Sequence, residues 1–244
     1  MRGRTAVLVI LGGTGGSGIV VSLFLSGLVR FNYPSAARYP VRGVDVSHHQ
    51  GRIDWVKLRD QGYAFAFIKA TEGADHHDPF FVANWSAARR EGLARGAYHF
   101  FTFCSAGEQQ AANFIATVAP GQEMLPPTVD IEFIGNCARP PNAVHIRAEL
   151  ATFLNRVEGA YARKAILYVT SDSYERIVSG AFPDHPIWVR NIFCEPKLAD
   201  HAGWTFWQYA DRGRIDGIAT LVDLNVFHGA TETFLACATL GHCR

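Results

Sequence analysis

Two acidic residues placed two positions apart are the feature of this sequence with the clearest chemical meaning. Asp130 and Glu132 lie in the stretch 129–132, which follows two prolines and a threonine. In a β-strand, residues i and i+2 point to the same face, roughly 6.5 to 7 Å apart. Two carboxyl groups this close do not ionise independently, so one is favoured as an acid while the other stays an anion. Such a pair suits the cleavage of a glycosidic bond.

The elements that must position this pair follow from the pattern of the chain. From residue 43 onward, short apolar runs alternate with amphipathic stretches, which predicts a mostly parallel sheet. Eight runs with short connections in the second half predict an α/β fold, a (β/α)-barrel of TIM type with eight strands and a reduced number of helices. The active site of such a barrel lies at the carboxyl ends of its strands. We expect strands at 43–47, 64–70, 95–100, 128–133, 165–170, 187–190, 205–209 and 222–227, and helices at 55–61, 79–91, 106–118, 143–161 and 171–177.

Polar residues stand where the predicted strands end. Acids occur on three of these strands, as Asp45, as the 130/132 pair and as Asp223, so we expect a barrel mouth lined with carboxylates. Other strand ends carry side chains that could stack on or bond to a sugar, and these complete the expected substrate site: Tyr98, Tyr168, Trp188, Trp207 and Gln208.

The sequence leaves structural explanations open for several of these residues. Asp45 could cap a turn or pair with an arginine, and Asp223 could be structural support. Asp130 and Glu132 could belong to a buried ion-pair network. The tryptophans could simply fill the barrel.

Basic residues and histidines near the predicted strand ends are also ambiguous. Lys69 and Glu72 could form a surface pair or steady the site. His48 and His49 resemble half a metal site, but no third ligand stands at a natural spacing. His99 could be a hydrogen-bonded core residue or a catalytic one. We therefore expect neither a metal nor a cofactor.

The first 42 residues have a different character from the rest. Two arginines precede an uncharged run at 6–29, which is long enough to cross a bilayer with some tilt. Its glycines weaken a soluble helix but are tolerated in membranes. We favour a signal anchor followed by a tether at 31–42, with a signal peptide cleaved near 35–37 or a buried helix as alternatives. The predicted domains are thus 1–42, the anchor or signal peptide with its tether, and 43–244, a catalytic barrel exported to the periplasmic or extracellular face.

Composition and cysteines narrow the class of protein further. The formal net charge of the 244 residues is +1, and no block rich in lysine or arginine occurs, so we do not expect nucleic-acid binding. We expect a monomer. Disulfides are plausible in an exported protein. Several pairings of the five cysteines are open. We predict Cys104 with Cys137, after neighbouring strands, and Cys237 with Cys243, near the end.

The order and joint presence of the motifs across residues 43 to 227 resemble glycoside hydrolase family 25, the lysozymes that cleave peptidoglycan as N-acetylmuramidases. The resemblance implies a (β/α)-barrel with fewer than eight helices. It rests on Gly43-Val44-Asp45-Val46-Ser47 with Gln50-Gly51, Ile68-Lys69-Ala70-Thr71-Glu72-Gly73, Asp78-Pro79-Phe80-Phe81 with Asn84, Gly96-Ala97-Tyr98-His99-Phe100, Asp130-Ile131-Glu132, Ile187-Trp188, Trp207-Gln208-Tyr209 and Val222-Asp223-Leu224-Asn225.

The resemblance also implies roles for the acids. Glu132 would be the general acid. Asp130 would act as nucleophile, or would orient the 2-acetamido group of the substrate for attack. Asp45 would tune or position its partners in the acidic cluster, to which Asp223 also belongs. The sequence departs from the family pattern at Arg190, where small residues are common.

The resemblance predicts a peptidoglycan hydrolase that cleaves the β-1,4 bond between N-acetylmuramic acid and N-acetylglucosamine. We expect retention with participation of the acetamido group, although the i, i+2 spacing alone does not decide between retention and inversion. A chitinase-like N-acetylglucosaminide hydrolase is one alternative, but the longer acidic run of that family is not present. A non-catalytic cell-wall-binding protein is another, against which the intact acid pair argues.

Overall fold

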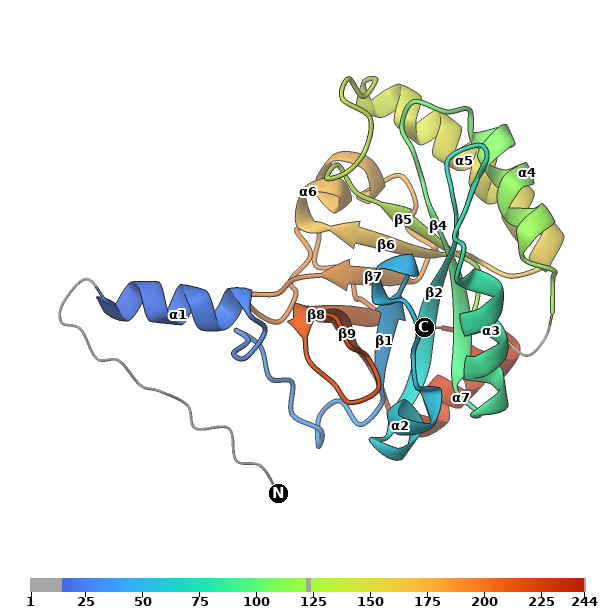
Figure 1. The fold of residues 1–244 in the computed structure, drawn as a ribbon. Coiled ribbons are helices and arrows are strands. Elements are labelled where there is room, and N and C mark those ends of the chain that lie inside the picture. Colours follow the sequence, from blue (N-terminus) through green and yellow to red (C-terminus); the bar gives the residue numbers. More distant parts are fainter. Residues whose placement is uncertain (1–14, 122–123, 244) are drawn as a thin grey trace.

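The chain folds around a closed barrel of eight strands (Figure 1). The computed structural model describes residues 15–121 and 124–243. Strand β1 pairs with both β9 and β2, and this double pairing closes the barrel. A two-residue strand, β3 (His76–His77), adds to β2 beside the barrel. The barrel strands are β1 (Arg42–Val46), β2 (Tyr63–Glu72), β4 (Ala94–Phe100), β5 (Thr128–Ile131), β6 (Ile166–Thr170), β7 (Ile187–Arg190), β8 (Phe206–Gly213) and β9 (Val222–Phe227).

The predicted eight-stranded barrel with few helices is therefore confirmed, with one difference in strand direction. Strand β9 runs antiparallel to both β1 and β8, whereas the other barrel pairs are parallel. A helix-length crossover is needed only between parallel neighbours. The described connection between the antiparallel strands β8 and β9 accordingly contains no helix.

Helices cover mainly the side of the barrel formed by β2, β4 and β5 (Figure 1). The predicted helices are all found, although the last one is a short turn of α-helix that continues as a π-helix. One helix, α7, was not predicted. The bounds are α2 (Trp55–Asp60), α3 (Phe81–Arg90), α4 (Gly107–Thr117), α5 (Ala143–Tyr161), α6 (Ser171–Ser173) and α7 (Thr231–Leu240), with a 3-10 turn η1 (His48–Gln50) and the π-helix η2 (Tyr174–Val178).

Helix α5 shows how the sequence specifies such an element. The side chain of Asn142 caps its first turn by accepting a hydrogen bond from the backbone N–H of His145 at 3.0 Å. The helix ends where Ala162 takes a left-handed conformation with φ 52°. Its buried residues repeat with the spacing of one helical face, which packs on the barrel and on α4: Ile146, Leu150, Phe153, Leu154 and Val157.

Aromatic rings fill the inside of the barrel. Phe67 stacks on Trp188 with 4.3 Å between ring centroids, and Phe65 meets Phe206 edge-on at 5.3 Å. A side chain at Gly43 or Gly96 would collide with the rings of Phe65 or Phe67, so these strand positions require glycine. Because the interior is packed, only the ends of the barrel can hold a ligand.

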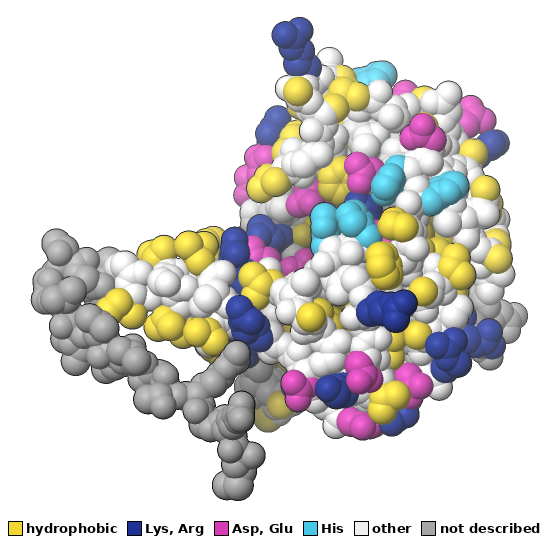
Figure 2. All heavy atoms as spheres, in the orientation of Figure 1, with side chains coloured by type: hydrophobic (Ala, Val, Ile, Leu, Met, Phe, Trp, Pro, Cys, Tyr) yellow, Lys and Arg dark blue, Asp and Glu magenta, His cyan; other side chains and the backbone are white. Residues whose placement is uncertain are grey.

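The predicted anchor lies only partly within the described residues. The expected anchor at 6–29 begins among residues 1–14, which lie outside the described part, and its described part forms α1 (Gly15–Leu25), eleven residues long. Among the described residues, no helix is long and apolar enough to span a membrane. Figure 2 shows apolar side chains exposed along α1, which projects from the barrel in Figure 1.

The predicted tether at 31–42 is instead packed against the barrel. Tyr39 is 2% exposed, and its hydroxyl donates a hydrogen bond to Glu195 at 2.9 Å. Arg38 donates two further bonds to the same carboxylate, at 2.8 and 2.7 Å. The domain boundary at residue 43 stays a prediction.

Both predicted disulfides are confirmed. Cys104 is bonded to Cys137, and Cys237 to Cys243. Cys194 is free and exposed.

Candidate active site

The acidic residues converge on a cavity of about 380 Å³ at the carboxyl ends of the parallel strands. Asp45 comes from the end of β1, Asp130 from β5 and Glu132 from just beyond it, while Asp223 enters from the start of the antiparallel β9. Tyr98 also lines the cavity, as predicted. The remaining lining residues are Val46, Ser47, His49, Gln50, Lys69, Glu72, Phe100, Ile134 and Gly135.

Asp45 and Asp223 form a coupled pair on one wall. They occupy opposed positions of β1 and β9, and their carboxyl groups share a hydrogen bond. Burial raises the pKa of Asp45 to about 6, while its hydrogen bonds oppose this rise. Burial and the Asp45 charge hold the pKa of Asp223 well above its usual range. The hydrogen bonds that Asp45 accepts favour its anionic form, whereas burial favours the protonated form of Asp223.

Two buried side-chain amides orient the carboxylate of Asp45 from inside the barrel. Gln208 Nε2 and Asn225 Nδ2 donate hydrogen bonds to Asp45 Oδ2 at 3.1 and 2.7 Å. The amide oxygens accept bonds in turn, Gln208 from the Tyr168 hydroxyl at 2.7 Å and Asn225 from Trp188 Nε1 at 2.8 Å. Each amide is thus fixed with its N–H groups toward the carboxylate.

This network contains three residues that we predicted as substrate contacts. Tyr168, Trp188 and Gln208 are buried and do not line the cavity, and they are linked to Asp45 by the hydrogen bonds above. Their predicted contact with substrate stays a prediction. Asn225, which we did not count among the site residues, completes the network. The sequence could have indicated Asn225, because it lies two residues after Asp223 and therefore on the same face of β9.

Trp207 is also placed away from the cavity. Its ring is 3% exposed and packs against Tyr39, with 5.9 Å between centroids. Its indole N–H donates to the backbone oxygen of Asn191 at 2.8 Å. Trp207 therefore packs against the N-terminal segment, and its predicted contact with substrate stays a prediction.

The central acid pair lies on the opposite wall from Asp45 and Asp223. Asp130 is the second-last residue of β5, whereas Glu132 lies one residue past the strand end. The Oδ1 atom of Asp130 is buried and has no hydrogen-bond partner among the described residues. Burial and the neighbouring Glu132 charge raise the pKa of Asp130 well above its usual range. An N–H or O–H group of a ligand could donate the hydrogen bond that this oxygen lacks.

Glu132 has the properties of a general acid at neutral pH. Burial raises its pKa to about 7, with a further rise from Asp45 and opposing effects from Arg190 and Lys69. A carboxylic acid with a pKa near the working pH can both deliver a proton and accept it back.

Lys69 and Glu72 supply opposite charges at the rim. Lys69 Nζ lies 2.6 Å from Glu72 Oε2 and 5.1 Å from the centroid of the Phe100 ring. The positive charge of Lys69 lowers the pKa of Asp130 and of Glu132. Both residues line the cavity, which agrees with the interpretation that they steady the site.

The histidines take different places. His99 is fully buried on the far side of β4, with its ring nitrogens 2.7 Å from Thr71 Oγ1 and 3.1 Å from Gln110 Oε1, and burial lowers its pKa to about 3. It is a core residue. His48 Nδ1 lies 3.0 Å from Asp78 Oδ2, and His49 lines the cavity. Within the described ranges, no three His, Cys, Asp or Glu side chains are grouped as a metal site.

A second cavity, of about 530 Å³, lies away from the acids, near the starts of β7 and β8. Its carboxylate, Asp200, already accepts bonds from the hydroxyls of Tyr174 and Ser179. Size alone would favour this cavity, but only the smaller one brings several carboxyl groups with raised pKa values together.

Comparison with known proteins agrees with this geometry. The sequence profile of Glycosyl hydrolases family 25 matches residues 44–218. YegX of Escherichia coli K12 is 40% identical over 205 residues, 82% of this chain and 74% of YegX. Lysozyme M1 of Streptomyces globisporus is 32% identical over 209 residues, 81% of this chain and 71% of that protein.

A solved structure extends the likeness to the fold. The family 25 glycosyl hydrolase from Bacillus anthracis superposes with a TM-score of 0.80 at 41% identity, covering 84% of this chain and 96% of that one. On the combined match of profile, sequence and fold, the chain belongs to glycosyl hydrolase family 25.

Proposed function

We propose that this protein is a muramidase, which hydrolyses the β-1,4 bond between N-acetylmuramic acid and N-acetylglucosamine in peptidoglycan. The observation that carries the proposal is the cavity in which Glu132, with its pKa raised to about 7, stands beside Asp130 in a family 25 barrel. The names of related proteins support the substrate class, since relatives are called Lysozyme M1 and N,O-diacetylmuramidase.

Glu132 would act first as acid and then as base. Its proton goes to the glycosidic oxygen as the bond to the anomeric carbon breaks, and the resulting carboxylate later removes a proton from the attacking water. The raised pKa keeps a useful fraction of Glu132 protonated near neutral pH.

Asp130 would manage the 2-acetamido group of the sugar. Its unpartnered Oδ1 can accept a hydrogen bond from the acetamido N–H, and this bond favours the anionic form of Asp130. The anion orients the acetamido oxygen for attack on the anomeric carbon. Like-charge repulsion from this anion then favours the protonated form of Glu132. This course retains the anomeric configuration, so an inverted first product in an NMR time course would contradict it.

The decisive experiment is the digestion of purified peptidoglycan by wild type and by Glu132→Gln. We expect products with muramic acid at the reducing end in mass spectra, and a fall in kcat of about 10²–10⁴-fold for the variant, with binding to the wall retained. Reducing-end glucosamine would point to a glucosaminidase, and equal digestion of chitin would support the chitinase-like alternative. Undiminished activity of the variant would remove Glu132 as the acid.

The substrate places the working enzyme outside the cytoplasm, and the two disulfides suit that environment. Within this proposal, the barrel is exported across a membrane and stays attached to that membrane through residues 6–29. The support is the exposed apolar side chains of α1, such as Val20 and Val21. Full-length protein should then sediment with membranes while a chain that lacks residues 1–29 does not. Equal distribution of both would rule the attachment out.

A further inference from the structure

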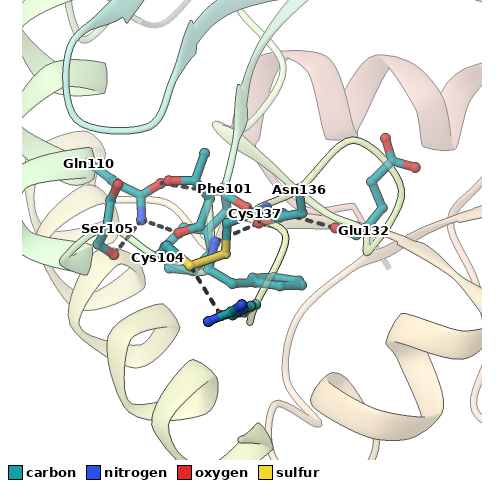
Figure 3. Close-up of a disulfide and its surroundings, with 10 residues drawn as sticks. Phe101, Cys104, Ser105, Gln110, Glu132, Asn136 and Cys137 are labelled. Carbon is teal, nitrogen blue, oxygen red and sulfur yellow. Dashed lines mark hydrogen bonds between the residues drawn. A yellow bond between two sulfur atoms is a disulfide. The ribbon is translucent and has the colours of Figure 1, made fainter. Parts of the chain in front are cut away.

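The loop that carries Glu132 is joined to the preceding βα loop by a disulfide. Residues 132–137 follow β5, residues 101–105 follow β4, and the bond between Cys104 and Cys137 links the two segments (Figure 3). The last paired residue of β5 is Ile131, so the sheet itself does not fix the backbone of Glu132. Its position depends on how this loop is held.

Asn136 connects the same two loops through hydrogen bonds. Its Nδ2 donates to the backbone oxygens of Glu132 and Phe101, both at 2.9 Å. Its Oδ1 accepts from the backbone N–H of Phe103 at 2.8 Å and of Cys137 at 3.0 Å. One amide thus ties the catalytic segment directly to the β4 loop (Figure 3).

The β4 loop is itself a rigid support. Gln110 of α4 is fully buried and accepts a bond from the backbone N–H of Thr102 at 2.8 Å. Its Nε2 donates to the backbone oxygens of Thr102 and Ser105, both at 2.9 Å. The loop that receives Asn136 and Cys137 is therefore fastened to a packed helix.

We propose that Asn136 and the Cys104–Cys137 disulfide form a clip that positions the side chain of Glu132 for proton transfer. Asn136 is a positioning residue, since it acts through the backbone of Glu132 and does not line the cavity. The proposal rests on the assignment of Glu132 as the acid. A catalytic group displaced by about 1 Å can lose about 10²-fold in rate, so this support has a measurable consequence.

The amide chemistry of Asn136 provides a sharp test. Asn136→Asp keeps the size and the acceptor oxygen but removes both donor bonds, including the one to Glu132. We expect kcat on solubilised peptidoglycan to fall by about 10- to 100-fold with little change in KM. The new carboxylate at 136 would itself raise the pKa of Glu132, so the pH profile is compared for the neutral variant Asn136→Leu. There the alkaline limb should move to lower pH, because a loosened Glu132 is more exposed to water. A residue that only stabilises the fold would lower the melting temperature without moving this limb.

The two disulfides provide a matched pair of variants. Cys104→Ser with Cys137→Ser removes the clip, whereas Cys237→Ser with Cys243→Ser removes a bond near the end of the chain, outside the cavity. Both double variants should have a lower melting temperature, but only the first should have a lower kcat and a shifted pH limb. The kinetics are measured at a temperature at which circular dichroism shows both variants to be folded.

The outcomes separate this proposal from the proposed function. If Glu132→Gln is inactive while Asn136→Asp keeps wild-type kcat, and Asn136→Leu and the Cys104/Cys137 double variant keep wild-type kcat and pH limb, the clip is overturned and the muramidase assignment stands. If Glu132→Gln stays active, the acid is misassigned and the positioning role falls with it.

Discussion

Asp45 and Asp223 face each other across the antiparallel pair of β1 and β9, and their carboxyl groups are hydrogen-bonded to each other. The direction of β9 makes this possible, because the start of that strand, and not its end, reaches the active-site mouth. Asp45 accepts the two amide bonds from inside the barrel, and these bonds favour its anionic form.

This asymmetry predicts different effects for two similar substitutions. Asp45→Asn should shift the alkaline limb of kcat/KM to lower pH, because the charge of Asp45 helps raise the pKa of Glu132. It should also lower kcat by at least about 10-fold. The new amide at position 45 can present to the donors of Gln208 and Asn225 either its N–H groups, which cannot accept their hydrogen bonds, or a neutral oxygen, which accepts them less strongly than a carboxylate does. Asp223→Asn keeps a donor toward Asp45 and should leave the limb in place. Equal shifts in both pH–rate profiles would show that the two carboxyl groups do not differ in this way.

Lys69 should have the opposite influence on the acid. Its positive charge lowers the pKa of Glu132, so Lys69→Met should move the alkaline limb to higher pH. The same assay of kcat/KM against pH checks this, with Lys69→Arg as the control that keeps the charge. A limb that moves downward, or moves equally in both variants, would contradict the electrostatic role.

Asp130 should lower the free energy of unfolding, because its function requires a buried carboxyl group. Its folded-state pKa lies well above that of the unfolded chain, so above pH 4 folding must either hold a proton or bury a charge. Asp130→Asn has no such cost. It should be inactive yet melt about 2–4 °C higher at pH 8, with the difference shrinking as the pH falls toward 4. Calorimetry at several pH values measures this difference in melting temperature. A difference that stays constant with pH, or that is reversed, would show that burial of Asp130 does not destabilise the fold.

Much of this arrangement could be predicted because it depends on local pattern. Apolar runs located all eight barrel strands, and acids at strand ends located the mouth. The direction of β9 could not be predicted, because a short connection permits an antiparallel neighbour but its side-chain pattern is the same in either direction. Helix α7 was missed because apolar residues lie all around it, so it lacks the one-sided pattern of α5.

The roles of the aromatic residues were harder to predict for a physical reason. Alternation along a strand says that two residues share a face, but not whether that face meets a cavity or a packed layer. Trp188 points into the barrel and Trp207 away from it. Only the three-dimensional structure reveals that Trp188 supports Asp45 through Asn225, whereas Trp207 packs against the N-terminal segment at Tyr39.

The Cys104–Cys137 bond has a consequence for when the enzyme becomes active. Thiols stay reduced in the cytosol of most mesophilic cells, whereas disulfides form in the periplasm or outside the cell. Until that bond forms, hydrogen bonds alone hold the backbone of Glu132, so the reduced enzyme should turn over more slowly than the oxidised one. The compartment that contains the substrate is then also the one in which the enzyme reaches its full rate.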